Sequence, residues 1–244
     1  HAEGNVWVGW EPPAEQDIPQ GPLGDSIRNG LDLFMHTDQR LPDFVGASMT
    51  CNSCHLEGGR KAYAATLAGV AARFPKFMPR TGAVIPLQDR VNYCFTRSLA
   101  GSRLPTDSKE MVDMIAYLTW LSQGVPIGMT VPEVDLPTLA LRDADVARGE
   151  KLYTEKTCIA CHGPEGAGVP GTFPALWGPR SWSVGASMTR LERAASFIKL
   201  FMPQTSRGSL TEQEAFDLAA YINSHPRPDA PLKEQDFPQG GAPA

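Results

Sequence analysis

The sequence lacks several features that define common classes of protein. No uninterrupted apolar run approaches the roughly 18 residues that a membrane-spanning helix requires, although 42% of the 244 residues are hydrophobic. Blocks of like charge are also missing and the formal net charge is only -5, so nothing indicates binding to a nucleic acid backbone. The 23 glycines and 22 prolines are too few for a wholly disordered polymer. We therefore expect a soluble globular protein of one large or two small domains.

Cysteine is also scarce, with five copies. Four of them form two C-x-x-C-H motifs, at residues 51–55 and 158–162. Two thiols at this spacing, where a chain turns into a helix, can each form a thioether with a haem vinyl group, and the adjacent histidine can then bind the iron. The motifs predict two covalently bound haem c groups. Their attachment cysteines and proximal histidines are Cys51, Cys54, His55, Cys158, Cys161 and His162.

A C-x-x-C pair alone is also typical of thioredoxin-like dithiols and of zinc sites. A zinc ribbon separates its pairs by roughly 15 to 20 residues, whereas 107 residues separate His55 from His162. The duplication and the histidine after each pair favour haem. Because this attachment is made outside the reducing cytosol, we expect a periplasmic protein. No charged and apolar signal segment precedes His1, so we expect an already processed chain.

The two haem motifs lie inside two longer, matching segments. In each copy a glycine is followed four residues later by an aromatic residue, Gly30 with Phe34 and Gly149 with Tyr153. We expect a helix at each of these places, and the glycine permits a close crossing against the last helix of the same copy. The repeat therefore predicts two homologous domains.

Each copy ends in a segment with helical spacing of its apolar residues, at 107–118 and 211–222. Both segments open with a capping signature, Asp107 or Thr211 followed three residues later by glutamate. The whole pattern resembles the class I cytochrome c fold. We expect an all-α protein with two cytochrome c-like domains in tandem, each with one covalently attached haem.

The composition between and around the copies predicts the domain boundaries. A proline-containing connector without a sustained period joins the two copies, and both ends of the chain are rich in proline. We expect an irregular N-terminal segment at 1–24, a first domain with the active-site haem at 25–122, a linker at 123–142, a second domain with the electron-transfer haem at 143–225, and a flexible tail at 226–244.

The second axial ligands decide the chemistry of the two haems, since ligand identity shifts the reduction potential. In the second copy Met202 lies 40 residues after His162 and is the expected ligand; the alternative is that it fills the core. In the first copy Cys94 lies 39 residues after His55, at the matching position. Met78, only 23 residues after His55, is the competing ligand.

Arginines surround the predicted cysteine ligand. No proline or glycine interrupts residues 87–100, and a helix there would place Arg90, Cys94, Arg97 and Ser98 on one face. Arg80 lies just upstream. Guanidinium groups bind oxyanions through paired hydrogen bonds, so these residues predict an anion site beside the first haem. The alternatives are a solvated face or pairing with haem propionates.

The chain resembles the periplasmic dihaem thiosulfate dehydrogenases. The resemblance spans residues 24–225, and its most specific parts are the two haem motifs, residues 90–98, and residues 197–203. It implies that Cys94 ligates the active-site haem, that Arg80, Arg90 and Ser98 line the substrate pocket, and that Lys199 is an alternative to Met202 as ligand of the second haem.

The resemblance further implies a reaction. Two thiosulfate anions are coupled to tetrathionate with release of two electrons, or the reverse. We expect Arg80, Arg90 and Arg97 to hold the sulfonate oxygens and Cys94 to take the sulfane sulfur into a transient adduct. The second haem passes electrons to an external acceptor such as a small cytochrome or a high-potential iron-sulfur protein. The alternatives are a plain dihaem electron carrier and a sulfur-oxidation haem subunit that acts on a carrier protein.

Overall fold

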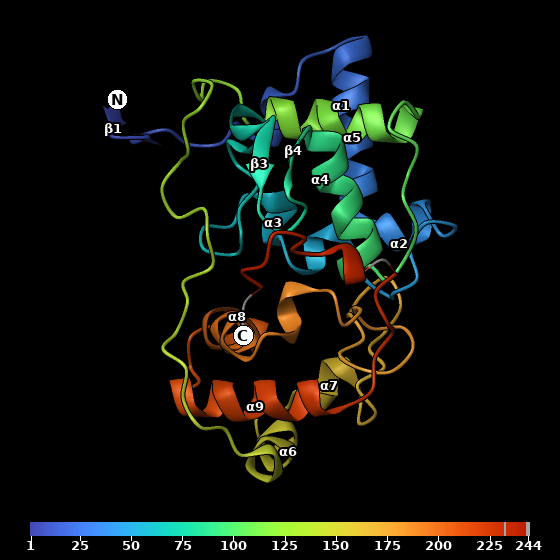
Figure 1. Cartoon of the computed structure of the whole chain (residues 1–244), viewed down its shortest axis with the longest axis vertical. Coiled ribbons are helices and arrows are strands. Elements are labelled where there is room, and N and C mark those ends of the chain that lie inside the picture. Colours follow the sequence, from blue (N-terminus) through green and yellow to red (C-terminus); the bar gives the residue numbers. More distant parts are fainter. Residues whose placement is uncertain (232, 243–244) are drawn as a thin grey trace.

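The computed structural model describes residues 1–231 and 233–242. Its helices form two groups stacked along the long axis of the molecule (Figure 1). The N-terminal half contains α1 (Pro22–Met35), α2 (Thr37–Arg40), α3 (Leu56–Gly59), α4 (Leu87–Tyr93) and α5 (Lys109–Trp120). The C-terminal half contains α6 (Val146–Glu155), α7 (Ile159–His162), α8 (Leu191–Phe201) and α9 (Glu212–Ser224). The described residues also form short 3-10 turns and two short antiparallel pairs of strands, β1 (Ala2–Glu3) with β2 (Val6–Trp7), and β3 (Lys76–Met78) with β4 (Ala83–Ile85).

One helix crossing in each half is made at a glycine. Helix α1 crosses α5 at Gly30, and α6 crosses α9 at Gly149. A Cβ atom on Gly30 would lie 2.0 Å from the backbone oxygen of Asp113, and one on Gly149 would lie 2.1 Å from that of Asp217. Because no side chain fits at such distances, glycine alone permits the approach. The close crossings predicted from the repeat are confirmed.

The last helices of the two halves, α5 and α9, have different N-caps. Thr211 caps α9 as predicted: its backbone N–H donates to the Glu214 carboxylate (2.7 Å), and the Glu214 N–H donates to the Thr211 hydroxyl (3.2 Å). For α5 the prediction of Asp107 as the cap is wrong by one residue. The hydroxyl of Ser108 is the cap, because it accepts from the N–H of Met111 at 3.2 Å.

The two halves share one apolar core. Its buried residues include Phe95 and Met111 from the N-terminal half and Trp182 and Phe216 from the C-terminal half. A smaller cluster joins Leu56, next to the first haem motif, to residues of α8. Burial of apolar surface therefore stabilises the two halves against each other as well as each half separately.

The segments outside the helices are also anchored. The connector between the halves runs down one side of the molecule (Figure 1), and its Leu136 carbonyl accepts a hydrogen bond from Arg193 (2.6 Å). Near the N-terminus, Trp10 packs beside Val125 and donates from Nε1 to the carbonyl of Gln123 (2.9 Å). Among the described residues, no helix has both the length and the apolar character needed to cross a membrane.

Candidate haem and anion site

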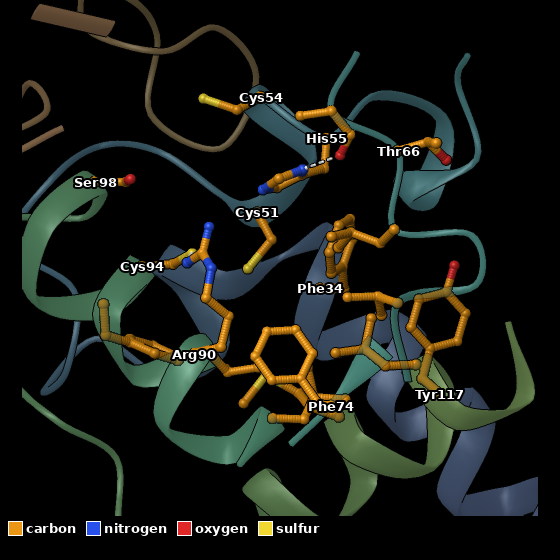
Figure 2. Close-up of a pocket in the computed structure, with 18 of the residues that line it drawn as sticks. Phe34, Cys51, Cys54, His55, Thr66, Phe74, Arg90, Cys94, Ser98 and Tyr117 are labelled. Atoms are coloured by element: carbon orange, nitrogen blue, oxygen red, sulfur yellow. Dashed lines mark hydrogen bonds between the residues drawn. The ribbon is translucent and has the colours of Figure 1, made fainter. Parts of the chain in front are cut away.

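A cavity of about 290 Å³ lies inside the N-terminal half. Apolar and aromatic side chains from α1, α5 and the loop before β3 line it. The two cysteines and the histidine of the first haem motif also line it. Figure 2 shows the labelled lining residues as sticks. These include Phe34, Cys51, Cys54, His55, Phe74, Arg90, Cys94, Ser98 and Tyr117. The predicted residues Cys51, Cys54, His55, Arg90, Cys94 and Ser98 are therefore brought together.

The imidazole of His55 is held in a fixed orientation. Its Nδ1 donates to the backbone carbonyl of Ala65 at 2.7 Å. With the proton on Nδ1, Nε2 keeps a lone pair that is suited to bind a metal. The motif in the C-terminal half has the same arrangement, since Nδ1 of the buried His162 donates to the carbonyl of Pro174 at 2.9 Å.

None of the five cysteines is in a disulfide, and all five lie in the described part of the chain. Each motif thus offers two free thiols next to an oriented imidazole, which is the donor set that covalent haem attachment requires. In the N-terminal half these groups face an apolar cavity. The residues present therefore fit a covalently attached haem.

Cys94 lies where α4 changes into a π-helical turn, Cys94–Ser98. The shared face considered from the sequence assumed a helix over 87–100, and the structure differs in the last turn, where the N–H of Leu99 donates to the carbonyl of Cys94 at 2.9 Å. Cys94 and Ser98 line the haem cavity, and Arg97 is not among its lining residues. Such π-helical turns are frequent at functional sites.

The thiol of Cys94 lies beside Arg90 and near the His55 imidazole. Nη1 of Arg90 donates to its Sγ at 3.0 Å. Burial raises the pKa of Cys94, but the positive charge of Arg90 and the nearby His55 imidazole outweigh burial and lower the pKa to about 6. By contrast, burial raises the pKa of Cys51 and of Cys54 to about 12.

A second cavity of about 110 Å³ adjoins the first. The two share Met78, Arg90 and Ser98, and the second is lined as well by Arg80 and Arg97. The three arginines that the sequence predicted for an anion site therefore line one small cavity. Concentrated positive charge of this kind attracts and holds anions.

Several residues of the second cavity were missed from the sequence. Tyr93 stacks under the guanidinium of Arg97, 4.1 Å from its ring centre. Gly185 and Ser187 come from the C-terminal half, and Thr81 follows β3. Tyr93 lies within the segment already singled out and was open to prediction, but no sequence motif marks the other three.

A carboxylate from the C-terminal segment reaches the same arginines. Asp236 forms ion pairs with Arg80 (2.6 Å) and with Arg97. Arg80 also donates to the carbonyl of Gly185 at 2.7 Å. The segment that the sequence predicted to be flexible thus contributes to the surroundings of the anion site.

The predicted ligands of the second haem lie at the end of α8. Met202 directly follows this helix and packs against the apolar cluster that contains Phe197 and Phe201. Lys199, one turn earlier, donates from Nζ to the carbonyl of Gly208 at 2.9 Å. Cys158 directly precedes α7 and Cys161 lies within this helix, and both are half-buried.

Comparison with known proteins assigns both halves of the chain. The family model described as SoxA/TsdA, cytochrome c domain, matches residues 45–127, and the model described as Cytochrome c matches residues 146–226. A thiosulfate dehydrogenase of Allochromatium vinosum is 44% identical over 93% of this chain and 88% of that protein. The chain belongs to the thiosulfate dehydrogenase family.

Two further relatives support membership of the thiosulfate dehydrogenase family. A thiosulfate dehydrogenase of Psychrobacter arcticus is 41% identical over 95% of this chain and 72% of that protein. Among solved structures, the thiosulfate dehydrogenase TsdBA from Marichromatium purpuratum superposes with a TM-score of 0.84 and 38% identity. The match covers 91% of this chain and 50% of that chain, so this protein spans half the length of the TsdBA chain.

These comparisons confirm several expectations from the sequence. The fold is two cytochrome c domains in tandem, and the cofactors of such domains are two covalently attached haem c groups. The resemblance to the thiosulfate dehydrogenase family and the expectation of an enzyme of that family are likewise confirmed.

Proposed function

We propose that this protein couples two thiosulfate anions to tetrathionate, with release of two electrons, at a site built around Cys94. The observation that carries the proposal is the position of the Cys94 sulfur. It lies in the same cavity as His55, within hydrogen-bond distance of Arg90, and next to a cavity bordered by three arginines. A nucleophilic sulfur beside an anion site is what sulfur–sulfur coupling of an oxyanion needs.

The residues that would hold the cofactors follow from the donor sets. Cys51 and Cys54 would form the thioethers of the first haem, and His55 and Cys94 would bind its iron. In the C-terminal half Cys158 and Cys161 would form the thioethers of the second haem, and His162 would bind its iron together with Met202 or, as the alternative, Lys199. Covalently attached haem supplies a one-electron acceptor in each domain, and thioether ligation raises its potential.

The arginines would bind the substrate. Arg80, Arg90 and Arg97 donate to the sulfonate oxygens of thiosulfate and orient its sulfane sulfur toward Cys94. The Cys94 thiolate would have to leave the iron for the next step. It then forms a sulfur–sulfur bond with the sulfane sulfur with loss of two electrons, leaving a cysteine S-thiosulfonate on the enzyme. The sulfane sulfur of a second thiosulfate attacks the sulfane sulfur of this adduct. Tetrathionate leaves, and the Cys94 thiolate is restored.

The proposal extends to the surroundings of the enzyme. We propose the domain boundaries given above, 25–122 and 143–225, and a periplasmic location, because covalent haem attachment takes place outside the cytosol. Electrons would leave through the C-terminal domain to an external acceptor, a small cytochrome or a high-potential iron-sulfur protein.

One specific observation favours a different function. Met78 lines the same cavity as Cys94, and a haem held by His55 and Met78 would make the protein an electron carrier. A third function, action on a sulfur carrier protein, would require a tightly bound partner chain. Full turnover of thiosulfate by the protein purified alone would contradict both.

The deciding experiment compares Cys94→Ala with Met78→Leu in the haem-loaded protein. We expect Cys94→Ala to abolish thiosulfate turnover with both haems still attached, and Met78→Leu to keep turnover near that of the parent. Absorption and electron paramagnetic resonance spectra report thiolate or thioether ligation independently of activity. Retained turnover in Cys94→Ala, or loss of haem ligation only in Met78→Leu, would refute the proposed function.

A further inference from the structure

The C-terminal segment returns from the C-terminal half to lie against the N-terminal half. After α9 it passes residues 178 and 184, where the carbonyls of Pro226 and Pro228 accept backbone hydrogen bonds. It then reaches Arg80, whose carbonyl accepts from the N–H of Phe237 at 2.8 Å. The ring of Phe237 lies 5.9 Å from the Arg80 guanidinium. Backbone and side-chain contacts therefore place Asp236 beside the anion site.

The carboxylate of Asp236 bridges two arginines of that site. Its Oδ2 accepts from Nε and Nη2 of Arg80, at 2.8 and 2.6 Å, and its Oδ1 accepts from Nη2 of Arg97. Only 12% of the Asp236 side chain is exposed, compared with 28% for Arg80 and 14% for Arg97. Such a two-sided contact between buried charges holds both guanidinium groups in defined orientations.

Without this carboxylate the two arginines would repel each other. Burial and the charge of Arg80 both lower the pKa of Arg97, and the ion pair with Asp236 opposes this effect. Asp236 thus allows two positive groups to remain side by side in a site largely shielded from water, where the repulsion is poorly screened.

Asp236 acts from outside the anion cavity. Arg80 and Arg97 line the cavity of about 110 Å³, whereas Asp236 is absent from its lining. Arg80 uses Nε and Nη2 for Asp236 and Gly185, so within the described structure its Nη1 is left for an anion. The carboxylate therefore supports the arginines and does not occupy the space of the substrate.

We propose that Asp236 is a positioning residue of the anion site, which holds Arg80 and Arg97 in the orientation that binds the sulfonate groups of the substrate. This inference rests on the proposed function, because it takes the arginine-lined cavity as the place where thiosulfate binds. It gives the C-terminal segment a role in substrate binding that neither haem motif nor the repeat implies.

The test measures thiosulfate oxidation by haem-loaded Asp236→Asn, Asp236→Glu and a control, Asp229→Asn. Asp229 lies on the same segment, is 70% exposed, and contacts Lys233 and the backbone N–H of Ala230, so its variant should match the parent. We expect Asp236→Asn to raise KM about tenfold, equivalent to about 1.4 kcal/mol, with kcat changed less than about twofold. Asp236→Glu should restore part of the affinity. Unchanged KM would overturn the proposal, and so would a lowered KM, because it would mean that the carboxylate competes with the substrate.

Two further measurements separate positioning from a structural effect. In a chain that already carries Arg80→Ala and Arg97→Ala, Asp236→Asn should cause no further loss of affinity for thiosulfate. A full additional loss of affinity in that chain would contradict action through these arginines. Titration of the fully reduced protein with thiosulfate, followed by calorimetry, gives the affinity without turnover, because reduced haems cannot accept the electrons of the substrate. If the parent protein fails to oxidise thiosulfate, the proposed function fails. The calorimetric comparison of parent and Asp236→Asn still tests the positioning role in that case.

Discussion

Arg90 and Arg97 lie on the same short helical segment but contact different parts of the site, and this difference makes a sharp prediction. Arg90 lines both cavities and donates to the Cys94 sulfur at 3.0 Å, whereas Arg97 lines only the anion cavity. We therefore expect Arg90→Gln to act mainly on kcat and Arg97→Gln mainly on KM. Glutamine keeps a hydrogen-bond donor at both positions and removes the positive charge.

The size of the Arg90 effect follows from the contact it loses. A hydrogen bond that involves a charged group contributes about 1.5–3 kcal/mol, and this one lies at a buried sulfur where solvent screens it little. At about 1.4 kcal/mol per factor of ten, kcat/KM should fall roughly 10- to 150-fold, with most of the loss in kcat.

Steady-state kinetics with thiosulfate and an artificial electron acceptor would measure both effects. Arg103→Gln is the matched control, because Arg103 is 45% exposed, pairs with Asp89 and lines neither cavity. Its kinetics should stay within about twofold of the parent. Equal shifts of the same parameter in Arg90→Gln and Arg97→Gln, with haem content unchanged, would refute the separate roles assigned to the two arginines.

Three further predictions concern stability. Gly30→Ala should lower the free energy of unfolding by about 2 kcal/mol in denaturant titrations. Overpacking against the Asp113 carbonyl costs about 3 kcal/mol, and the higher helix propensity of alanine offsets about 1 kcal/mol of this. Unchanged stability would contradict the tight crossing. Thr211→Ala should cost about 1 kcal/mol in the same assay through loss of the cap of α9, and a neutral result would argue against that cap. Hydrogen bonds from Lys156 and the Thr211 backbone lower the pKa of Glu214 from 4.5 to about 2, so its stabilising contribution is present above pH 4.5 and is lost as the pH falls toward 2. Glu214→Gln should therefore flatten the dependence of stability on pH in that interval, and parallel curves for parent and variant would exclude the effect.

Local chemistry and spacing determined much of this protein from its sequence. Two thiols and a histidine within five residues have few uses, so the haem motifs were visible without a structure. The helix crossings were predictable as well, because glycine in place of a side chain at Gly30 and Gly149 marks a close approach of two helices. Cys94 was singled out by its position in the repeat, and in the structure it lines the same cavity as His55.

Features that depend on packing over long sequence separations were not predictable in this way. Gly185, Ser187 and Asp236 reach Arg80 or the anion cavity from the far half of the chain, and no local pattern records that contact. The π-helical turn after Cys94 also escaped prediction, because the choice between α and π hydrogen bonding is a small energy difference that surrounding packing decides. The sequence by itself thus predicted which groups carry the chemistry. Only the tertiary structure decided which charges surround the arginine-lined cavity, because those charges meet through the docking of two domains and a terminal segment.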